Sequence, residues 1–124
     1  MKKKIRFIVN PKSGVGNKAN IPQMIADHLD LSIYDYDIVE TEYRKHAKLI
    51  AKDSADAGYD IVCAVGGDGS VHEVGTALIG TKTKLAILPV GSGNGLARHM
   101  KIPLNVKEAI ECINKNNSIQ MDTV

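Results

Sequence analysis

The chain of 124 residues contains no tryptophan, a single phenylalanine and a net charge of only +2. Proteins that bind nucleic acid usually present a clustered excess of Lys and Arg, and binders of single strands add aromatic side chains for base stacking. Sixteen basic residues against fourteen acidic ones, with aromatic residues at 4%, provide neither feature. The composition therefore argues against a nucleic-acid partner.

Cysteines and long apolar segments are also scarce. The two cysteines, Cys63 and Cys112, form no CxxC pair and have no histidine at metal-ligand spacing, which favours a reduced, cytoplasmic protein. The basic N-terminus leads into an apolar run that ends at Asn10 and Pro11, too short for a signal peptide. No apolar run approaches the ~20 residues of a membrane span, so we expect any membrane contact to be peripheral.

What the chain does contain is an alternation of apolar strands and amphipathic helices. The expected strands are 5–9, 32–40, 61–65 and 85–88. The expected helices are 18–29, 42–57, 70–79, 95–100 and 105–114. This alternation predicts right-handed βαβ units and thus a three-layer α/β domain, in which a parallel sheet lies between two layers of helices.

The last residues, 118–124, have the pattern of a further strand that begins and is cut off. We interpret residues 1–124 as a single domain and as a fragment, the first lobe of a larger protein. A domain that simply ends on an edge strand is the alternative.

Three glycine-rich loops, 10–18, 66–73 and 89–98, follow three of the expected strands. In open α/β folds the ligand crevice lies beyond the carboxyl ends of the strands. Glycines let the backbone approach a ligand closely, and successive amides at a helix N-terminus bind anions. The loops therefore predict a phosphate site, where the carboxylate of Asp68 could hold a Mg²⁺ ion beside the phosphates.

Spacing excludes two common phosphate-binding motifs. The segment from Gly14 to Lys18 lacks the GxxxxGK[ST] spacing of a P-loop. The segment from Gly91 to Leu96 has a leucine where a dinucleotide-binding fingerprint requires its last glycine. These loops therefore belong to neither class.

Taken together, the motifs Asn10-Pro-x-Ser-Gly14, Gly66-Gly-Asp-Gly-Ser-x-x-Glu73 and Pro89-x-Gly-Ser-Gly-Asn94 resemble the catalytic domain of the diacylglycerol kinase and sphingosine kinase superfamily. The Gly-Gly-Asp-Gly element alone is shared with NAD kinases and 6-phosphofructokinases, but the order and spacing of all three motifs are specific. The resemblance implies the nucleotide-binding lobe of an ATP-dependent lipid kinase, with a fold similar to the corresponding lobe of NAD kinases. It also implies a C-terminal, β-rich lobe that this chain lacks.

The resemblance assigns expected roles to residues of these motifs. Asp68 is expected to act on magnesium and the nucleotide, and the role of general base is open between Asp68 and an acid of the second lobe. Glu73 could position Asp68 or a phosphate-bound water, or it could be a solvated or capping residue. The residues expected to bind ATP are Asn10, Ser13, Gly14, Thr41, Gly66, Gly67, Asp68, Gly69, Ser70, Glu73, Ser92, Gly93 and Asn94.

The sequence also departs from the pattern of bacterial diacylglycerol kinases. The third loop has Gly-Ser-Gly-Asn-Gly at 91–95, where those kinases commonly have Gly-Thr-x-Asn-Asp, and Lys45 stands where many members have glycine. The acceptor lipid, a diacylglycerol or a sphingoid base, is therefore left open. His46 and His28 are expected to be solvated or capping residues.

We expect a lipid substrate at a membrane surface, the missing lobe and a possible second copy of the chain as partners. The isolated domain is expected to bind nucleotide weakly and to turn over no lipid. Two other functions remain open, a soluble kinase of the NAD kinase or phosphofructokinase type and a nucleotide-binding module without catalysis.

Overall fold

The computed structural model describes residues 2–9, 21–43, 45–66, 68–89, 106–115 and 119–120. Its strands are β1 (Lys3–Val9), β2 (Tyr34–Glu40), β3 (Ile61–Gly66), β4 (Lys84–Pro89) and β5 (Ile119–Gln120). Its helices are α1 (Ile21–His28), α2 (His46–Asp56), α3 (Asp68–Leu78) and α5 (Val106–Asn114). The predicted alternation of strands and helices is confirmed, and the helix expected at 95–100 lies outside the described residues.

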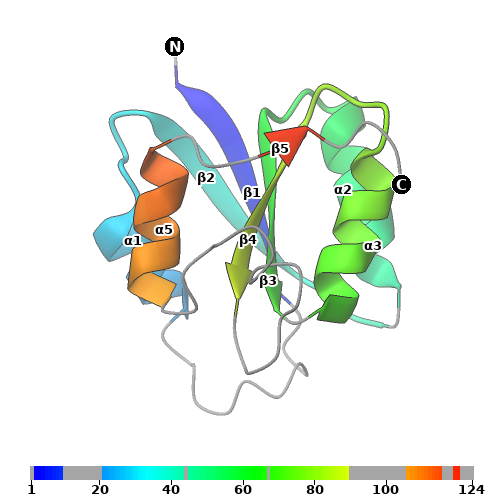
Figure 1. The fold of residues 1–124 in the computed structure, drawn as a ribbon, viewed down its shortest axis with the longest axis horizontal. Coiled ribbons are helices and arrows are strands. Elements are labelled where there is room, and N and C mark those ends of the chain that lie inside the picture. The colour runs from blue at the N-terminus through cyan, green and yellow to red at the C-terminus, as the bar shows by residue number, and fades with distance from the viewer. Residues whose placement is uncertain are drawn as a thin grey trace.

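The strands form one sheet in the order β2-β1-β3-β4-β5. β1 pairs in parallel with β2 and β3, and β3 pairs in parallel with β4. α1 and α5 cover one face of the sheet, while α2 and α3 cover the other (Figure 1). The predicted three-layer α/β architecture is therefore confirmed. The short β5 departs from the parallel pattern, because it runs antiparallel to the first residues of β4.

The start of α2 differs from the prediction. The sequence pattern places the helix from 42 onward, whereas the structure begins it at His46. The Thr41 amide donates a hydrogen bond to the Val9 carbonyl at 2.9 Å, so this residue still follows the sheet. Lys45 then adopts a left-handed backbone with φ 68°, which breaks the helical path before His46. Helical periodicity alone does not reveal such a turn.

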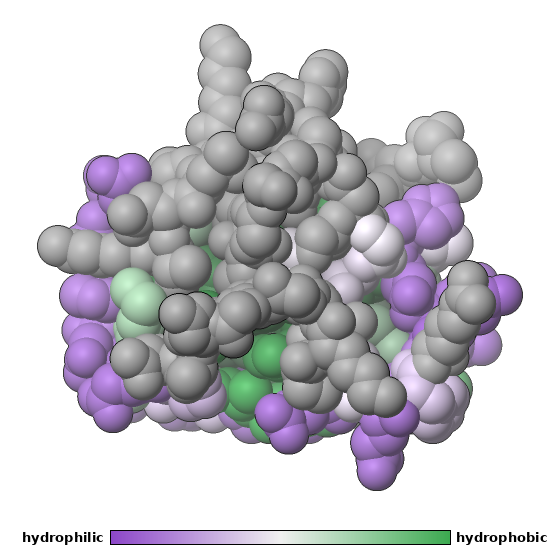
Figure 2. All heavy atoms as spheres, turned by 90° about the horizontal axis from the view of Figure 1, so that it is seen from below, coloured by the Kyte–Doolittle hydropathy of each residue, from purple (hydrophilic) through white to green (hydrophobic). Residues whose placement is uncertain are grey.

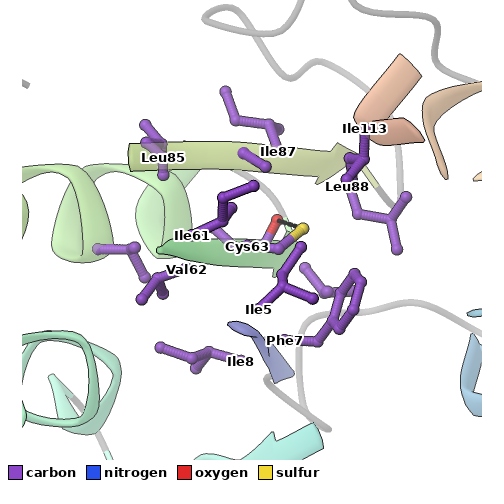
Figure 3. Packing of buried hydrophobic residues seen from close by; sticks show 14 of the residues in the cluster. Ile5, Phe7, Ile8, Ile61, Val62, Cys63, Leu85, Ile87, Leu88 and Ile113 are labelled. Carbon is purple, nitrogen blue, oxygen red and sulfur yellow. Dashed lines mark hydrogen bonds between the residues drawn. The ribbon is translucent and has the colours of Figure 1, made fainter. Parts of the chain in front are cut away.

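The core is centred on β3, whose residues are all buried, as expected for a central parallel strand. Figure 3 shows side chains of β1, β3, β4 and α5 packed together, among them Phe7, Val62 and Ile113. Cys63 is fully buried here and packs as a small core hydrophobe. Burial raises the pKa of its thiol, so this cysteine stays protonated and unreactive.

Hydrogen bonds tie α5 to the connection between α1 and β2. The Tyr34 hydroxyl donates to the Ile113 carbonyl at 2.9 Å in a buried contact. The Asn114 carboxamide bridges two further groups, accepting from the Asp30 amide at 2.7 Å and donating to the His28 carbonyl at 2.9 Å. We call these three hydrogen bonds, made by Tyr34 and Asn114, the α5 latch. The latch lies near the amino end of β2.

A polar cluster joins β1, β2 and α2 on the opposite face of the sheet. The Arg6 guanidinium donates to both carboxylate oxygens of Asp37, at 2.8 and 3.0 Å. The Tyr59 hydroxyl donates to the same carboxylate at 2.6 Å, and Arg6 also reaches the Ser54 hydroxyl at 3.3 Å. These hydrogen bonds, above all the one from Arg6, lower the pKa of Asp37.

This lowered pKa predicts a pH-dependent contribution to stability. Because the pKa of Asp37 is lower in the folded than in the unfolded chain, its stabilising effect is complete above the unfolded value of about 3.9. The effect is lost as pH falls through the lower folded value. We expect Asp37→Asn to reduce the free energy of unfolding at pH 7, and the difference from the wild type to shrink below about pH 4.

Urea unfolding between pH 7 and pH 3 measures this difference. Asp35→Asn is the matched control on the same strand, because Asp35 is exposed and its ion pair with Lys2 is long at 3.8 Å. We expect that variant to stay within about 0.5 kcal/mol of the wild type. An Asp37→Asn deficit that stays constant across this pH range would contradict the prediction.

Candidate functional site

The carboxyl ends of the four parallel strands meet at one edge of the sheet. Val9 lies opposite Glu40 on one side and Val65 on the other, and Gly66 lies opposite Pro89. Figure 1 shows these strand ends pointing downward, and α3 begins at the same level. A helix N-terminus presents free amides and a partial positive charge. This edge therefore favours an anionic ligand, as the sequence predicts.

Figure 2 looks at this edge from below. Hydrophilic side chains gather along its flanks, and hydrophobic side chains are visible between them.

The second glycine motif spans the junction of β3 and α3. Gly66 ends β3 and is buried, and Asp68 is the first residue of α3. The backbone of Asp68 therefore lies at the predicted phosphate end of the helix. Ser70 and Glu73, within the first two turns, are half-buried.

Gly69 is the second residue of α3, and neither conformation nor packing explains it. Its φ lies outside the left-handed region, and a Cβ placed there would meet no atom within 4 Å. An alanine would fit, and a glycine inside a helix is about 0.5–1 kcal/mol less stable than alanine. Within the described residues, the fold therefore gives no structural reason for a glycine at this position.

Thr41 lies at the same edge, directly after β2. It is only 9% exposed, and its amide bond to the Val9 carbonyl fixes it beside the end of β1. The structure thus brings Thr41, Gly66, Gly69 and Ser70 to one end of the fold, and their binding of ATP stays a prediction.

Other predicted binding residues lie outside the described residues. They are Asn10, Ser13, Gly14, Gly67, Ser92, Gly93 and Asn94. The side chain of Asp68 is likewise outside the description. Among the side chains that are described, no three His, Cys, Asp or Glu residues gather as metal ligands, and the magnesium site stays a prediction.

The loop between β2 and α2 carries a feature that the sequence analysis missed. The rings of Tyr43 and His46 are stacked, with centroids 4.3 Å apart and an interplanar angle of 15°. The His46 Nδ1 accepts a hydrogen bond from the Glu42 amide at 2.9 Å, four residues earlier in the chain, so its imidazole orders the turn before α2 and does not cap the helix. The sequence signal that could have indicated this stack is the presence of two ring-bearing side chains three residues apart at the start of a helix.

Comparison with known proteins identifies the family. The model of the protein family described as "Diacylglycerol kinase catalytic domain" matches residues 4–124. The chain belongs to this family. Diacylglycerol kinases of two Staphylococcus aureus strains, bovine RF122 / ET3-1 and MRSA252, are each 32% identical to it over 125 residues. Each alignment covers 98% of this chain and 39% of the relative.

Solved structures agree with this diacylglycerol kinase family assignment. A crystal structure of a diacylglycerol kinase from Bacillus anthracis str. Sterne has a TM-score of 0.78 and 28% identity, covering 92% of this chain and 39% of that one. A second structure from the same organism has a TM-score of 0.81 and 31% identity. The predicted resemblance and fold are confirmed, and the chain spans about two fifths of the length of these relatives.

The diacylglycerol kinase family uses ATP. Within the part of the chain that the structure describes, no helix is long and apolar enough to cross a membrane.

Proposed function

We propose that this domain is the nucleotide-binding lobe of an ATP-dependent lipid kinase. The enzyme transfers the γ-phosphate of ATP to a hydroxyl of a diacylglycerol or a sphingoid base at a membrane surface. The observation that carries the proposal is Gly69, an exposed glycine in the first turn of α3 that the fold itself does not require. The family match supports a lipid acceptor over the soluble acceptors of NAD kinases and phosphofructokinases.

The chemistry of phosphoryl transfer fits this edge of the sheet. Transfer of a γ-phosphoryl group depends on positioning and on neutralising charge more than on covalent help from the protein. The amides at the start of α3 hold the phosphate oxygens, and Gly69 leaves room for them to approach. The hydroxyl of Thr41, in the loop after β2, donates a hydrogen bond to a phosphate oxygen.

Asp68 has the chemistry that a magnesium site requires. Mg²⁺ is commonly bound through one or two carboxylates together with phosphate oxygens, and Asp68 opens the helix at which the phosphates bind. Magnesium bound there supplies the charge neutralisation that the leaving phosphates need. The proton of the acceptor hydroxyl goes to a carboxylate, either Asp68 or an acid of the second lobe.

The remaining part of the longer protein completes the enzyme in this proposal. The relatives are more than twice as long as this chain, and their additional residues provide the length for a lipid cleft. The protein works in the cytoplasm and touches the membrane peripherally, as a monomer or as a homodimer.

The test uses the full-length protein with Mg²⁺ and ATP labelled at the γ-phosphate. Vesicles contain diacylglycerol, sphingosine or neither lipid. We expect the label to enter the organic phase with one of the two lipids and to stay in water with plain vesicles. Parallel reactions contain NAD or fructose 6-phosphate in place of the vesicles. Transfer of the label to either of these, or no transfer to any acceptor by a protein that binds ATP, would contradict the proposal.

A further inference from the structure

The stacked rings of Tyr43 and His46 form an open aromatic surface. Tyr43 is 59% exposed although its ring lies against that of His46. The other aromatic rings that pack in pairs, Phe7 and Tyr36, meet edge to face instead. A flat ring could therefore continue the stack on the exposed side of Tyr43.

A hydrogen bond in the same turn orients the His46 ring, and the Tyr43 ring stacks on it. Because the His46 Nδ1 accepts from the Glu42 amide, its ring proton resides on Nε2 and the orientation of the imidazole is fixed. The His46 amide donates to the Tyr43 carbonyl at 3.2 Å, which closes the turn. The stack is thus a preformed surface, so the binding of a ligand ring there would cost little side-chain conformational entropy.

The position of the stack suits a nucleotide. α2 and α3 pack against each other on one face of the sheet. His46 begins α2 and Asp68 begins α3, and both helices begin at the edge where the parallel strands end (Figure 1), so the stack and the phosphate end of α3 lie at the same edge. Thr41 precedes Tyr43 by two residues, a backbone reach of at most about 7 Å. A base on the stack could therefore share one nucleotide with these phosphate-binding groups.

We propose that Tyr43, backed by His46, is the platform on which the adenine base of ATP stacks. This inference rests on the proposed function, because it assumes that the edge binds a nucleotide. Stacking is available to any base, so the platform adds affinity for purine nucleotides and leaves the choice among them to other residues.

The experiment measures the dissociation constants of Mg-ATP and of magnesium tripolyphosphate with the full-length protein by calorimetry. We expect Tyr43→Ala to weaken ATP binding about tenfold, the effect typical of losing one stacked base. Tyr43→Phe keeps the ring and is expected to stay within about twofold of the wild type. Tripolyphosphate has no base, so its binding is expected to be the same in all variants.

Leu49→Ala is the matched control, because Leu49 is another exposed apolar residue at the start of α2. We expect Leu49→Ala to change neither the dissociation constant of Mg-ATP nor that of magnesium tripolyphosphate. Unchanged ATP binding in Tyr43→Ala, or equal weakening of ATP and tripolyphosphate, would overturn the platform and leave the proposed function intact. A wild-type protein that binds tripolyphosphate but gains nothing from the adenosine of ATP would overturn the platform as well. Absence of any ATP binding would overturn both proposals.

Discussion

Replacement of Asp68 by asparagine in the full-length protein is expected to lower kcat for phosphoryl transfer about 1,000-fold. Asparagine keeps the size of the side chain and suits a helix start, so α3 should still form. What it removes is the negative charge that holds magnesium against the phosphates. Loss of one preorganised charged group in such a site typically costs about 10²–10³ in rate, and loss of the metal adds to this.

Steady-state rates at increasing magnesium concentration check this prediction, since a weakened metal site should respond to added metal. Glu73→Gln is the control from the same helix, and its half-buried side chain lies beyond the first turn of α3. We expect its rate to fall less than about tenfold, because it removes a neighbour of the site rather than a metal ligand. Asp68→Asn activity within tenfold of the wild type would exclude Asp68 from both the metal and the base role.

The largest effect on stability is expected from Tyr34→Ala. Tyr34 is 1% exposed and is among the largest fully buried side chains, and its hydroxyl bonds the Ile113 carbonyl. Truncation leaves a cavity beneath α5 and an unpaired carbonyl, and a change of this kind costs about 4 kcal/mol. For a domain of this size the corresponding fall in Tm is roughly 15 °C.

Tyr34→Phe separates the ring from the hydroxyl. It keeps the packing and removes only the hydrogen bond to Ile113, so we expect a loss of about 1–2 kcal/mol. Thermal and urea denaturation of the domain measure both variants. Equal losses for Tyr34→Phe and Tyr34→Ala would show that the hydrogen bond, and not the packing of the ring, provides the stability.

Periodicity predicted most of the fold because each parallel strand is short, apolar and followed by an amphipathic helix. β3 is buried along its whole length and was predicted almost to the residue. Lys45 marks where this reasoning fails, because a lysine gives no local signal for φ 68°. The turn carries local hydrogen bonds, from the His46 amide to the Tyr43 carbonyl and from the Glu42 amide to the His46 Nδ1, which helical periodicity does not reveal. The antiparallel β5 is likewise decided by its pairing with β4 and not by its own residues.

For the site, the glycine motifs were sufficient to predict the edge of the sheet at which Thr41, Gly66, Gly69 and Ser70 lie. Strand ends of a parallel sheet meet at one edge whatever their side chains are, so the location follows from topology alone. The ring stack of Tyr43 and His46 could not be predicted in this way. It depends on a turn geometry and on a hydrogen bond from the Glu42 amide, neither of which is visible in residue types.

The α5 latch has a consequence for the order of folding. Its hydrogen bonds join residues that are 79 to 86 positions apart in the chain. A ribosome adds roughly 5–20 residues per second. Ile113 is therefore synthesised roughly 4–16 s after Tyr34, with which it forms a hydrogen bond. During that interval one face of the nascent sheet lacks its second helix and exposes apolar surface. Protection of the growing chain by a chaperone is therefore most needed before α5 is made.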